Sequence, residues 1–266
     1  MPIRFCPAAS GSNGNCSYFS TGKTTILIDA GLSGVRIEAR LNSVGASAAE
    51  VGAIFVTHEH SDHVAGVGVL SRRFDIPVYA TAGTWAAMER DRAVGRVAPK
   101  NRRLIYNEEN VLFNDLVLRP FAIPHDAAEP VGYAVSAQGA KVVVATDIGC
   151  VTGAVRENIL GADIILLESN HDEEMVKNGR YPEALKSRIL GSKGHLSNTN
   201  CGKLLAEVIS DRVKHVYLGH LSDENNNPGL AYETVRAILS AARTGVNESF
   251  RLRLTDRSAA GEMVFL

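Results

Sequence analysis

The sequence predicts an α/β fold, because apolar strand-like runs and amphipathic helical stretches follow one another along the chain. Apolar residues make up 45% of the 266 residues, enough to bury a substantial core. Glycine is frequent (24 residues) and aromatic residues contribute only 6%, as expected of an α/β protein with many tight turns. No linker, internal repeat or low-complexity segment divides the chain, so we expect a single domain that spans residues 1–266.

The hydrophobic pattern gives the order of the expected elements. Apolar, β-branched runs predict strands at residues 3–6, 16–20, 25–29, 53–57, 77–80, 104–106, 111–113, 116–121, 130–135, 141–147, 163–168 and 214–218. Amphipathic stretches predict helices at residues 35–44, 62–70, 82–90, 155–160, 198–209 and 230–242, with short helices between 172 and 190. Two final strands are expected after the last helix. Thr81 is expected to cap the third helix, in which Trp85 and Met88 face the core.

Charge and cysteine content limit the classes of function. The formal net charge is −1, so no overall field draws the molecule to nucleic acid, although a local basic groove stays open. The four cysteines form no C-x-x-C pair, and Met1 leads directly into the first expected strand without a secretory signal. No apolar run reaches the roughly 18–20 residues of a membrane span. We therefore expect a cytoplasmic protein with reduced thiols and no membrane partner.

The densest chemical motif is the segment 56–63, Val-Thr-His-Glu-His-Ser-Asp-His, between an expected strand and an expected helix. His58 and His60 are two residues apart in an extended segment, so both side chains can point to one side. Asp62 and His63 are adjacent at the start of the helix and point elsewhere. Imidazole and carboxylate groups suit zinc, iron or manganese, so each pair can hold one divalent ion. The alternative is a polar loop that happens to contain three histidines.

Other segments offer groups that bind anions or cations. Residues 9–15 are all small or polar, and they can cradle a phosphate with backbone N–H groups or form an ordinary hairpin turn. The stretch 186–193 contains Lys186, Arg188 and Lys193 but no acidic residue. Asp147 ends a wholly apolar strand, where a carboxylate is poorly solvated unless cations compensate its charge.

The H-x-H-x-D-H pattern of residues 58–63 resembles the signature of the metallo-β-lactamase superfamily. The resemblance implies a four-layer αββα sandwich with a hydrolytic site that holds one or two metal ions. It also implies that Asp29 orients the histidine loop without binding metal strongly. The ligands that it implies are His58, His60 and His125 for the first ion and Asp62, His63 and His220 for the second, with Asp147 bridging the two. Taken alone, His125 is typical of a loop and Asp29 of a turn.

Seven ligands at strand ends predict metal-assisted hydrolysis. Two ions about 3.5–4 Å apart can share a hydroxide and lower the pKa of its parent water. This chemistry does not by itself choose between a phosphodiester, a lactam, a thioester and a lactone. Asp62 and His195 are the expected catalytic residues, because Asp62 gives the second ion an oxygen-rich site and His195 resembles the proton-donating histidine of the superfamily's tRNA-processing enzymes. The alternative for His195 is a loop residue before a helix that Ser197 caps, and His171 is a second candidate of the same kind.

Six segments together resemble the bacterial YycJ/WalJ group, which is regarded as a group of 5′-to-3′ exodeoxyribonucleases that act in DNA repair and prefer manganese-type ions. They are Ser-Gly-Ser-Asn-Gly-Asn, Thr-His-Glu-His-Ser-Asp-His, Pro-His-Asp-Ala-Ala-Glu-Pro-Val-Gly, Glu-Ser-Asn-His-Asp, Gly-His-Leu-Ser-Asn and His-Leu-Ser-Asp-Glu-Asn-Asn. The resemblance implies contacts with DNA phosphates from Ser12, Asn13, Asn15, Ser197 and Asn198. Asn13 stands where the group is expected to have a serine, and it keeps a polar side chain.

The sequence therefore predicts a metal-dependent phosphodiester hydrolase, a nuclease that acts on the 5′ ends of DNA with two manganese or zinc ions and a bridging hydroxide. The alternative is a small-molecule metallo-hydrolase of the same fold, such as a cyclic-nucleotide phosphodiesterase or a lactonase. A further alternative is a metal-binding or RNA-binding module without enzymatic activity. The sequence does not indicate an oligomeric state.

Overall fold

A computed structural model describes residues 2–91 and 94–266. Met1, which was expected to lead into the first strand without a secretory signal, lies outside the described residues. The strands are β1 Arg4–Ala9, β2 Cys16–Ser20, β3 Thr25–Ile28, β4 Ala53–Phe55, β5 Val78–Ala80, β6 Arg102–Leu104, β7 Val111–Phe113, β8 Leu116–Ala122, β9 Val131–Ala137, β10 Ala140–Ala145, β11 Ile164–Glu168, β12 His215–Gly219, β13 Arg251–Leu254 and β14 Val264–Phe265. The helices are α1 Gly34–Ser43, α2 Ser61–Val64, α3 Val67–Phe74, α4 Ala82–Asp91, α5 Gly153–Ile159, α6 Glu173–Asn178, α7 Glu183–Leu190, α8 Asn198–Val208 and α9 Pro228–Ala241, with 3-10 turns η1 Ala48–Glu50 and η2 Pro99–Asn101.

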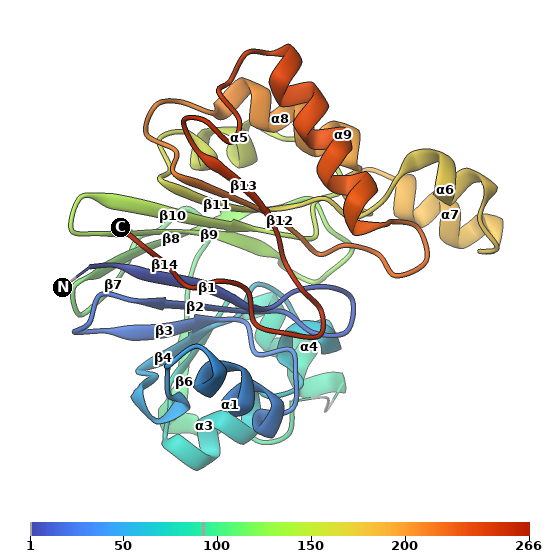
Figure 1. Cartoon of the computed structure of the whole chain (residues 1–266). Helices are drawn as coiled ribbons and strands as arrows, with labels where there is room; N and C mark the ends of the chain where they lie inside the picture. Colours follow the sequence, from blue (N-terminus) through green and yellow to red (C-terminus); the bar gives the residue numbers. More distant parts are fainter. Residues whose placement is uncertain (1, 92–93) are drawn as a thin grey trace.

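Two β-sheets pack face to face, and helices cover both outer faces (Figure 1). Within the described residues each sheet has seven strands, in the orders β14-β1-β2-β3-β4-β5-β6 and β13-β12-β11-β10-β9-β8-β7. Both sheets are mixed: β1 to β3 and β7 to β10 pair antiparallel, whereas β3 to β6 and β10 to β13 pair parallel. The predicted four-layer αββα sandwich is confirmed.

The core between the sheets is built from apolar side chains of both inner faces. Phe55 packs edge-on against Tyr133 of the opposite sheet with ring centroids 5.8 Å apart, and Phe5 meets Tyr217 at the same separation. The Tyr133 hydroxyl donates to the Val56 carbonyl at 2.8 Å, which satisfies this polar atom inside the core. These contacts join the two halves of the chain across the core between the sheets.

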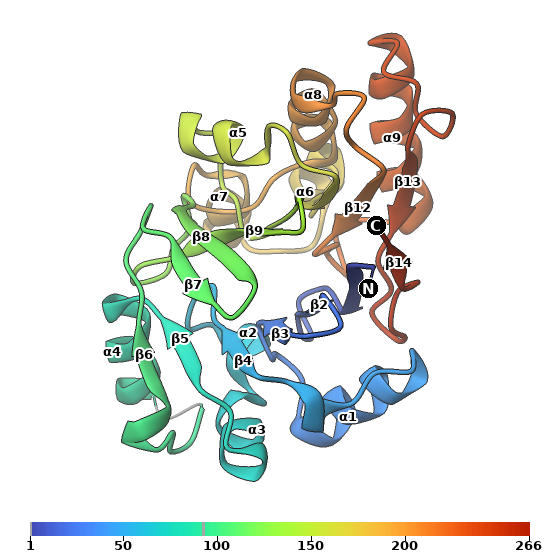
Figure 2. The ribbon, with the colours of Figure 1, turned by 90° about the vertical axis from the view of Figure 1, so that its left-hand side faces the viewer.

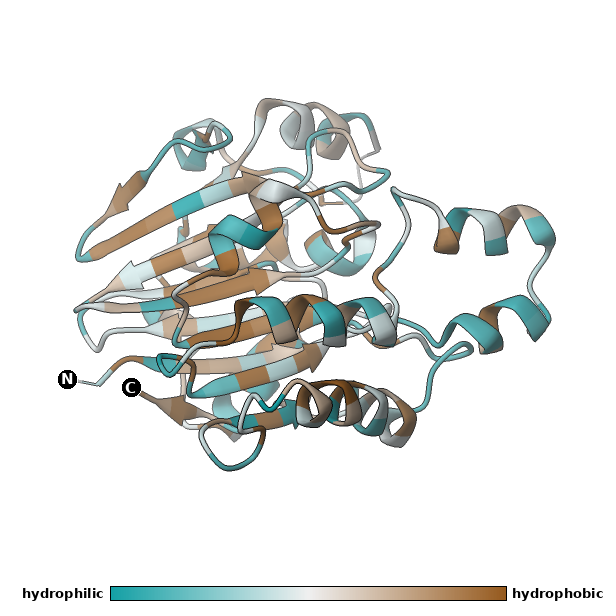
Figure 3. Cartoon of the chain, turned by 90° about the horizontal axis from the view of Figure 1, so that it is seen from above, coloured by the Kyte–Doolittle hydropathy of each residue, from teal (hydrophilic) through white to brown (hydrophobic). Residues whose placement is uncertain are grey.

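Each outer sheet face has its own apolar core under a layer of helices (Figure 2). Helices α1, α3 and α4 cover one face, and both Trp85 and Met88 of α4 are buried there as predicted. Helices α5, α8 and α9 cover the other face. Figure 3 shows apolar colours along the strands and mixed colours on the helices, as expected of amphipathic helices on a buried sheet. Thr81 accepts from the Thr84 backbone N–H at 3.3 Å, so the predicted cap of α4 is present.

Two expected elements differ from the structure. The helix expected over 62–70 is split into α2 and α3, because the Gly66 N–H donates to the Ala30 carbonyl at 2.8 Å, outside the helix, and so leaves the helical hydrogen-bond ladder. The strand expected at 104–106 is β6, two residues earlier, where it pairs parallel with β5. All three β6 residues are exposed, so no apolar run marks this edge strand in the sequence.

The helices α6 and α7 project from the body of the sandwich, beside the loops that carry the site (Figure 1). None of the eight α7 residues is fully buried. Across residues 2–91 and 94–266, no helix combines the length and the apolar character that crossing a bilayer requires.

Candidate metal centre

The seven side chains expected to bind metal gather at one rim of the sandwich, where loops leave the ends of strands. They lie in the β4–α2 loop and α2 (His58, His60, Asp62 and His63), after β8 (His125), after β10 (Asp147) and after β12 (His220). Their donor atoms form groups of three or more whose members all lie within 4.8 Å of one another. The structure therefore brings together residues that are up to 162 positions apart (220 − 58).

The first group consists of His58, His60 and His125. The Nε2 atoms of His58 and His125 lie 3.1 and 3.3 Å from Nδ1 of His60. His58 is fully buried and His125 nearly so. Three ring nitrogens that face one another at these distances suit a cation that takes imidazole ligands, because lone pairs alone would repel.

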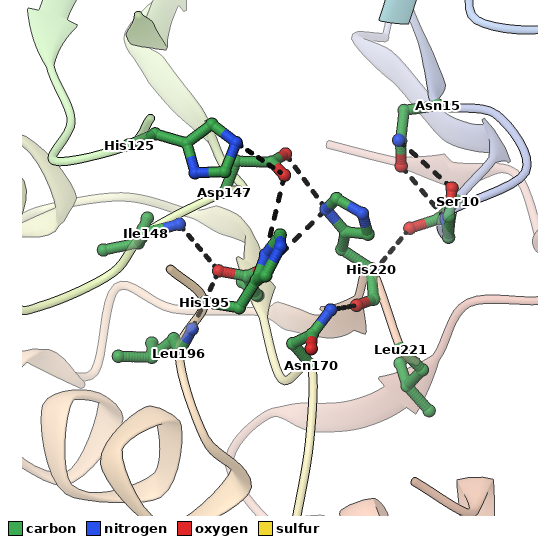
Figure 4. Close-up of polar contacts among 12 residues, drawn as sticks. Ser10, Asn15, His125, Asp147, Ile148, Asn170, His195, Leu196, His220 and Leu221 are labelled. Carbon is green, nitrogen blue, oxygen red and sulfur yellow. Dashed lines mark hydrogen bonds and ion pairs between the residues drawn. The ribbon is translucent and has the colours of Figure 1, made fainter. Parts of the chain in front are cut away.

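Asp62, His63 and His220 form the second group, and Asp147 lies between the two groups. Asp62 Oδ2 is 3.5 Å from His63 Nε2 and 3.7 Å from His220 Nε2. Asp147 Oδ2 is 3.1 Å from His63 Nε2 and 2.9 Å from His220 Nδ1. Its other oxygen, Oδ1, is 3.6 Å from His125 Nε2 (Figure 4). One carboxylate thus faces both groups.

Two buried polar atoms that lack hydrogen bonds indicate that these residues can bind divalent cations. Asp147 Oδ2 and His220 Nδ1 are buried, and neither makes a hydrogen bond with another described residue even though they lie 2.9 Å apart. Buried polar atoms are nearly always hydrogen-bonded, so such a pair at one point indicates a ligand for both. Imidazole nitrogens mixed with carboxylate oxygens are a donor set that zinc and manganese accept.

Acceptors around the cluster fix how the histidine rings point. His63 Nδ1 lies 2.7 Å from Asp29 Oδ2, and the Asp29 carboxylate also accepts from the backbone N–H and the hydroxyl of Thr57, both at 2.8 Å. Further contacts of this kind join Thr57 Oγ1 to His58 Nδ1 at 3.0 Å and the Gly194 carbonyl oxygen to His125 Nδ1 at 3.2 Å. Because these Nδ1 atoms face outward, the Nε2 atoms of the same three rings face the cluster and can bind a cation.

Electrostatics in the second group favour bound positive charge. Burial opposes the charged form of His63, yet Asp29 and Asp147 raise the pKa of its ring well above the ordinary value. Burial likewise opposes charge on His220, and Asp147 raises the pKa of that ring. Burial would raise the pKa of Asp147, but His220 and His63 hold it well below its usual range. His58 differs, since burial keeps the pKa of its ring well below the ordinary value.

Three residues of the centre have a left-handed backbone. Asp29, Asp147 and His220 follow β3, β10 and β12, and their φ angles are 61°, 60° and 53°. Such conformations cost about 1–3 kcal/mol in residues other than glycine and persist where surrounding contacts impose them. At His220 these contacts are the Ser10 hydroxyl, which accepts from its N–H at 2.8 Å, and the Asn170 amide, which donates to its carbonyl oxygen at 2.8 Å (Figure 4).

Glu168 is a functional candidate that the sequence analysis missed. It ends β11 and is fully buried. Oε1 lies 2.8 Å from His195 Nδ1, while Oε2 accepts from the backbone N–H groups of Ile148 and Leu196 at 2.6 and 3.0 Å (Figure 4). Burial opposes charge on His195, but Glu168 raises the pKa of this ring to about 9. The signal was the one that singled out Asp147, a carboxylate at the end of an apolar strand.

In the glycine-rich loop before β2, two of the side chains expected to contact phosphate are exposed and the third is buried. Ser12 is exposed, and the exposed Asn13 side chain donates to Asp223 at 3.2 Å. Asn15 is 5% exposed, and its amide nitrogen lies 3.0 Å from His63 Nε2. The structure thus places Asn15 against the metal ligands, whereas Ser12 and Asn13 face the solvent beside them.

The other expected substrate contacts are buried. His171, Ser197 and Asn198 are at most 3% exposed. Ser197 accepts from the Asn200 backbone N–H at the start of α8 and donates to Glu173 at 2.9 Å. The Asn198 side chain is hydrogen-bonded to Ser169 and Asn226, while Nδ1 of His171 has no partner among the described residues. A role of these residues in DNA binding stays a prediction.

Two of the basic side chains in the stretch 186–193 form ion pairs with acidic side chains from outside that stretch. Lys186 donates to Glu183 at 2.9 Å and to the Lys177 carbonyl at 2.8 Å, and the Arg188 guanidinium donates to Asp126. Lys193 is exposed. The positive charge of this stretch is therefore partly neutralised before any substrate arrives.

The fold and the cluster define a hydrolase of the metallo-β-lactamase type. The family described as "Beta-lactamase superfamily domain" matches residues 24–221. Exodeoxyribonuclease YycJ of Bacillus anthracis is 42% identical over 96% of both chains, and exodeoxyribonuclease WalJ of Streptococcus pneumoniae is 38% identical over 97% of this chain and 96% of its own. The crystal structure of the metallo-beta-lactamase fold protein YhfI from Bacillus subtilis has a TM-score of 0.73 at 14% identity, covering 100% of this chain and 99% of its own. The chain therefore belongs to the beta-lactamase superfamily and, within it, to the family of the YycJ and WalJ exodeoxyribonucleases.

Proposed function

We propose that this protein is a two-metal 5′-to-3′ exonuclease that acts on DNA in the bacterial cytoplasm. The observation that carries the proposal is the convergence of two ligand groups on Asp147, in a chain 42% identical to an exodeoxyribonuclease. His58, His60 and His125 would hold the first ion, and the second group would hold the other. Manganese and zinc both accept this mixture of nitrogen and oxygen donors.

Two divalent ions bound in these groups would lower the pKa of a water molecule and neutralise charge on the phosphoryl oxygens. The chain's own residues supply the rest. Asp62, whose side chain is partly exposed, would hold the second ion from the solvent side of its group. Asp29 and Thr57 keep the histidine rings turned toward the cluster, so that the geometry is present before the substrate binds.

His195 is the proposed general acid. Its Nδ1 is held by Glu168 at 2.8 Å and lies 3.7 Å from Asp147 Oδ1, so the ring stands beside the reacting centre and leaves Nε2 as the nitrogen that would donate the proton. Cleavage of a phosphodiester expels a 3′-oxygen, a poor leaving group that needs a proton. A pKa of about 9 keeps this ring protonated at neutral pH. Ser12 and Asn13, with Asn15, His171, Ser197 and Asn198 behind them, are the proposed residues around the DNA phosphates.

A small-molecule metallo-hydrolase is the second candidate, and one observation favours it. The cavity beside His195 has a volume of only about 160 Å³ and is lined partly by Tyr181, Leu185 and Ile189. A space of that size suits a small ester as well as the end of a polymer.

The test is release of nucleotides from a labelled duplex with 5′-phosphate or 5′-hydroxyl ends, in manganese, magnesium or zinc. We expect metal-dependent release of mononucleotides from the 5′ end, and a loss of at least a thousandfold in Asp147→Asn. Asp211→Asn, an exposed aspartate, is the matched control and should retain full activity. Turnover of cyclic nucleotides or lactones without any release from DNA would favour the second candidate.

A further inference from the structure

A cavity of about 160 Å³ opens between the metal centre and the projecting helix α7, and we call it the α7 cavity. One wall is polar and includes Ser12, Asn170, Ser222 and His195. The opposite wall belongs to the segment that leads into α7 and to α7 itself. Tyr181, Leu185, Arg188 and Ile189 line it.

The α7 wall holds apolar side chains that the fold does not need for its own core. None of the α7 residues is fully buried, and α7 packs mainly against α6, outside the three main apolar cores. Tyr181, Leu185 and Ile189 are nevertheless only partly exposed, because they face the cavity. The Tyr181 hydroxyl makes no hydrogen bond with any residue in the described part of the chain. An aromatic ring and two aliphatic side chains opposite hydroxyls and an amide are suited to a flat ring system with polar edges.

Two contacts hold this wall in place over the metal centre. Arg188 pairs with Asp126, the residue after the metal-site histidine His125. The Ile189 carbonyl accepts from the His195 backbone N–H at 3.0 Å. The distance between the α7 wall and His195 is therefore set by direct links, and the cavity keeps its width without help from a ligand.

The chemistry of the proposed reaction decides which part of the substrate enters. Water gives up a proton to the solvent, the oxygen of the resulting hydroxide forms the new bond to phosphorus, the bond from phosphorus to the 3′-oxygen breaks, and His195 gives its proton to that 3′-oxygen. In 5′-to-3′ cleavage this 3′-oxygen belongs to the nucleotide that is released. The group next to His195, on the side away from the metal ligands, is therefore the 5′-terminal nucleoside.

We propose that the α7 cavity holds the 5′-terminal nucleoside as a single unpaired unit, with its base packed against Tyr181. This proposal rests on the proposed nuclease function. The volume of the α7 cavity, about 160 Å³, is below the roughly 300–1,000 Å³ of sites for drug-sized ligands, so the cavity leaves no room for a base pair and takes the base of a single nucleoside. Tyr181 is a substrate-binding residue that accepts any base, since an aromatic face stacks on every base and the cavity offers few groups that could distinguish one base from another.

A thermodynamic cycle that combines variants of the enzyme with variants of the substrate tests the stacking. Single-turnover release is measured for Tyr181→Ala, Tyr181→Phe and the unchanged enzyme, each with a normal or an abasic 5′-terminal nucleotide. We expect Tyr181→Ala to raise KM about 5- to 150-fold on the normal end, the range measured for one base–aromatic stack. On the abasic end Tyr181→Ala should raise KM less than twofold. Tyr181→Phe should have the KM of the unchanged enzyme on both ends. Tyr106→Ala, an exposed tyrosine between β6 and β7, is the matched control.

A second measurement tests whether the terminal nucleotide enters unpaired. Duplexes that differ only in a matched or mismatched 5′-terminal base pair are compared, and we expect faster release from the mismatched end because no pair must be opened. Equal KM values for Tyr181→Ala and the unchanged enzyme on normal ends, or equal rates on matched and mismatched ends, would overturn the proposal. Either result leaves the nuclease function standing, whereas absence of release from every DNA in the unchanged enzyme removes the proposed function itself.

Discussion

Replacing Glu168 with glutamine tests whether His195 works as a general acid. The carbonyl oxygen of glutamine can still accept from the backbone N–H groups of Ile148 and Leu196, so the local fold is expected to persist. The negative charge beside His195 is lost, and with it the main cause of the raised pKa of that ring. We expect the pKa of His195 to fall from about 9 toward the ordinary value near 6.5.

The size of the effect follows from the protonated fraction of His195. With pKa values of about 9 and 6.5, the unchanged enzyme and Glu168→Gln differ about twofold at pH 6.5, about tenfold at pH 7.5 and about 80-fold at pH 8.5. The sign is fixed because a general acid must be protonated, so the variant loses rate as pH rises through the lowered pKa. His195→Ala should lose about 10²–10⁴-fold at every pH in this range.

The assay is a pH–rate profile of mononucleotide release between pH 6.5 and 8.5 with saturating metal. A phosphodiester with a p-nitrophenolate leaving group serves as the comparison substrate, since that group leaves without a proton and the loss should shrink below about threefold. Glu207→Gln, a surface glutamate paired with Arg156, is the matched control. A pH-independent loss that is equal for both leaving groups would refute the reasoning and assign Glu168 to metal binding.

Three further predictions concern the metal ligands. Chelation followed by dialysis is expected to abolish nuclease activity and lower the melting temperature, since an ion at 100 times its Kd adds about 2.7 kcal/mol; differential scanning calorimetry before and after manganese is restored measures this. Asp29→Asn should weaken metal affinity about 10–100-fold at unchanged circular dichroism, because the amide can donate to His63 where the carboxylate accepted; unchanged affinity by titration calorimetry would contradict this role. The two ions should differ in pH dependence: the lowered pKa values of His58 and His125 mean that these two rings release no proton when the first ion binds near neutral pH, whereas the raised pKa values of His63 and His220 mean that the second ion displaces protons from those rings and binds more weakly as pH falls. Calorimetry at pH 7 in two buffers of different ionisation enthalpy separates the two events.

Local patterns in the sequence were enough to place most elements and to assemble the metal cluster. The spacing of residues 58–63 and the apolar strands before His125, Asp147 and His220 are visible within short windows of sequence. The family resemblance indicated that these side chains meet at one metal centre. Glu168 carried the same strand-end signal, but nothing local shows that its carboxylate meets His195 27 residues later.

Contacts between distant segments could not be predicted in this way. The hydrogen bond from the His220 N–H to Ser10 joins residues 210 positions apart across the two sheets. The amide of Asn15 was assigned to phosphate from its loop, yet the structure places it 3.0 Å from His63, because the Asn15 backbone is hydrogen-bonded to Asp62 and Gly31 in loops of the same sheet. The split between α2 and α3 likewise depends on the hydrogen bond from the Gly66 N–H to the Ala30 carbonyl, which only the packed structure reveals.

The left-handed backbone at Asp29, Asp147 and His220 bears on how descendants of this gene would change if hydrolysis were no longer under selection. At each of these corners glycine or asparagine would relieve local strain, but the exchange would remove a side chain that the metal centre uses. A lineage released from that selection should therefore drift toward glycine or asparagine at all three corners while its sandwich stays intact. Such a triple signature would mark degenerate copies of the enzyme from sequence alone.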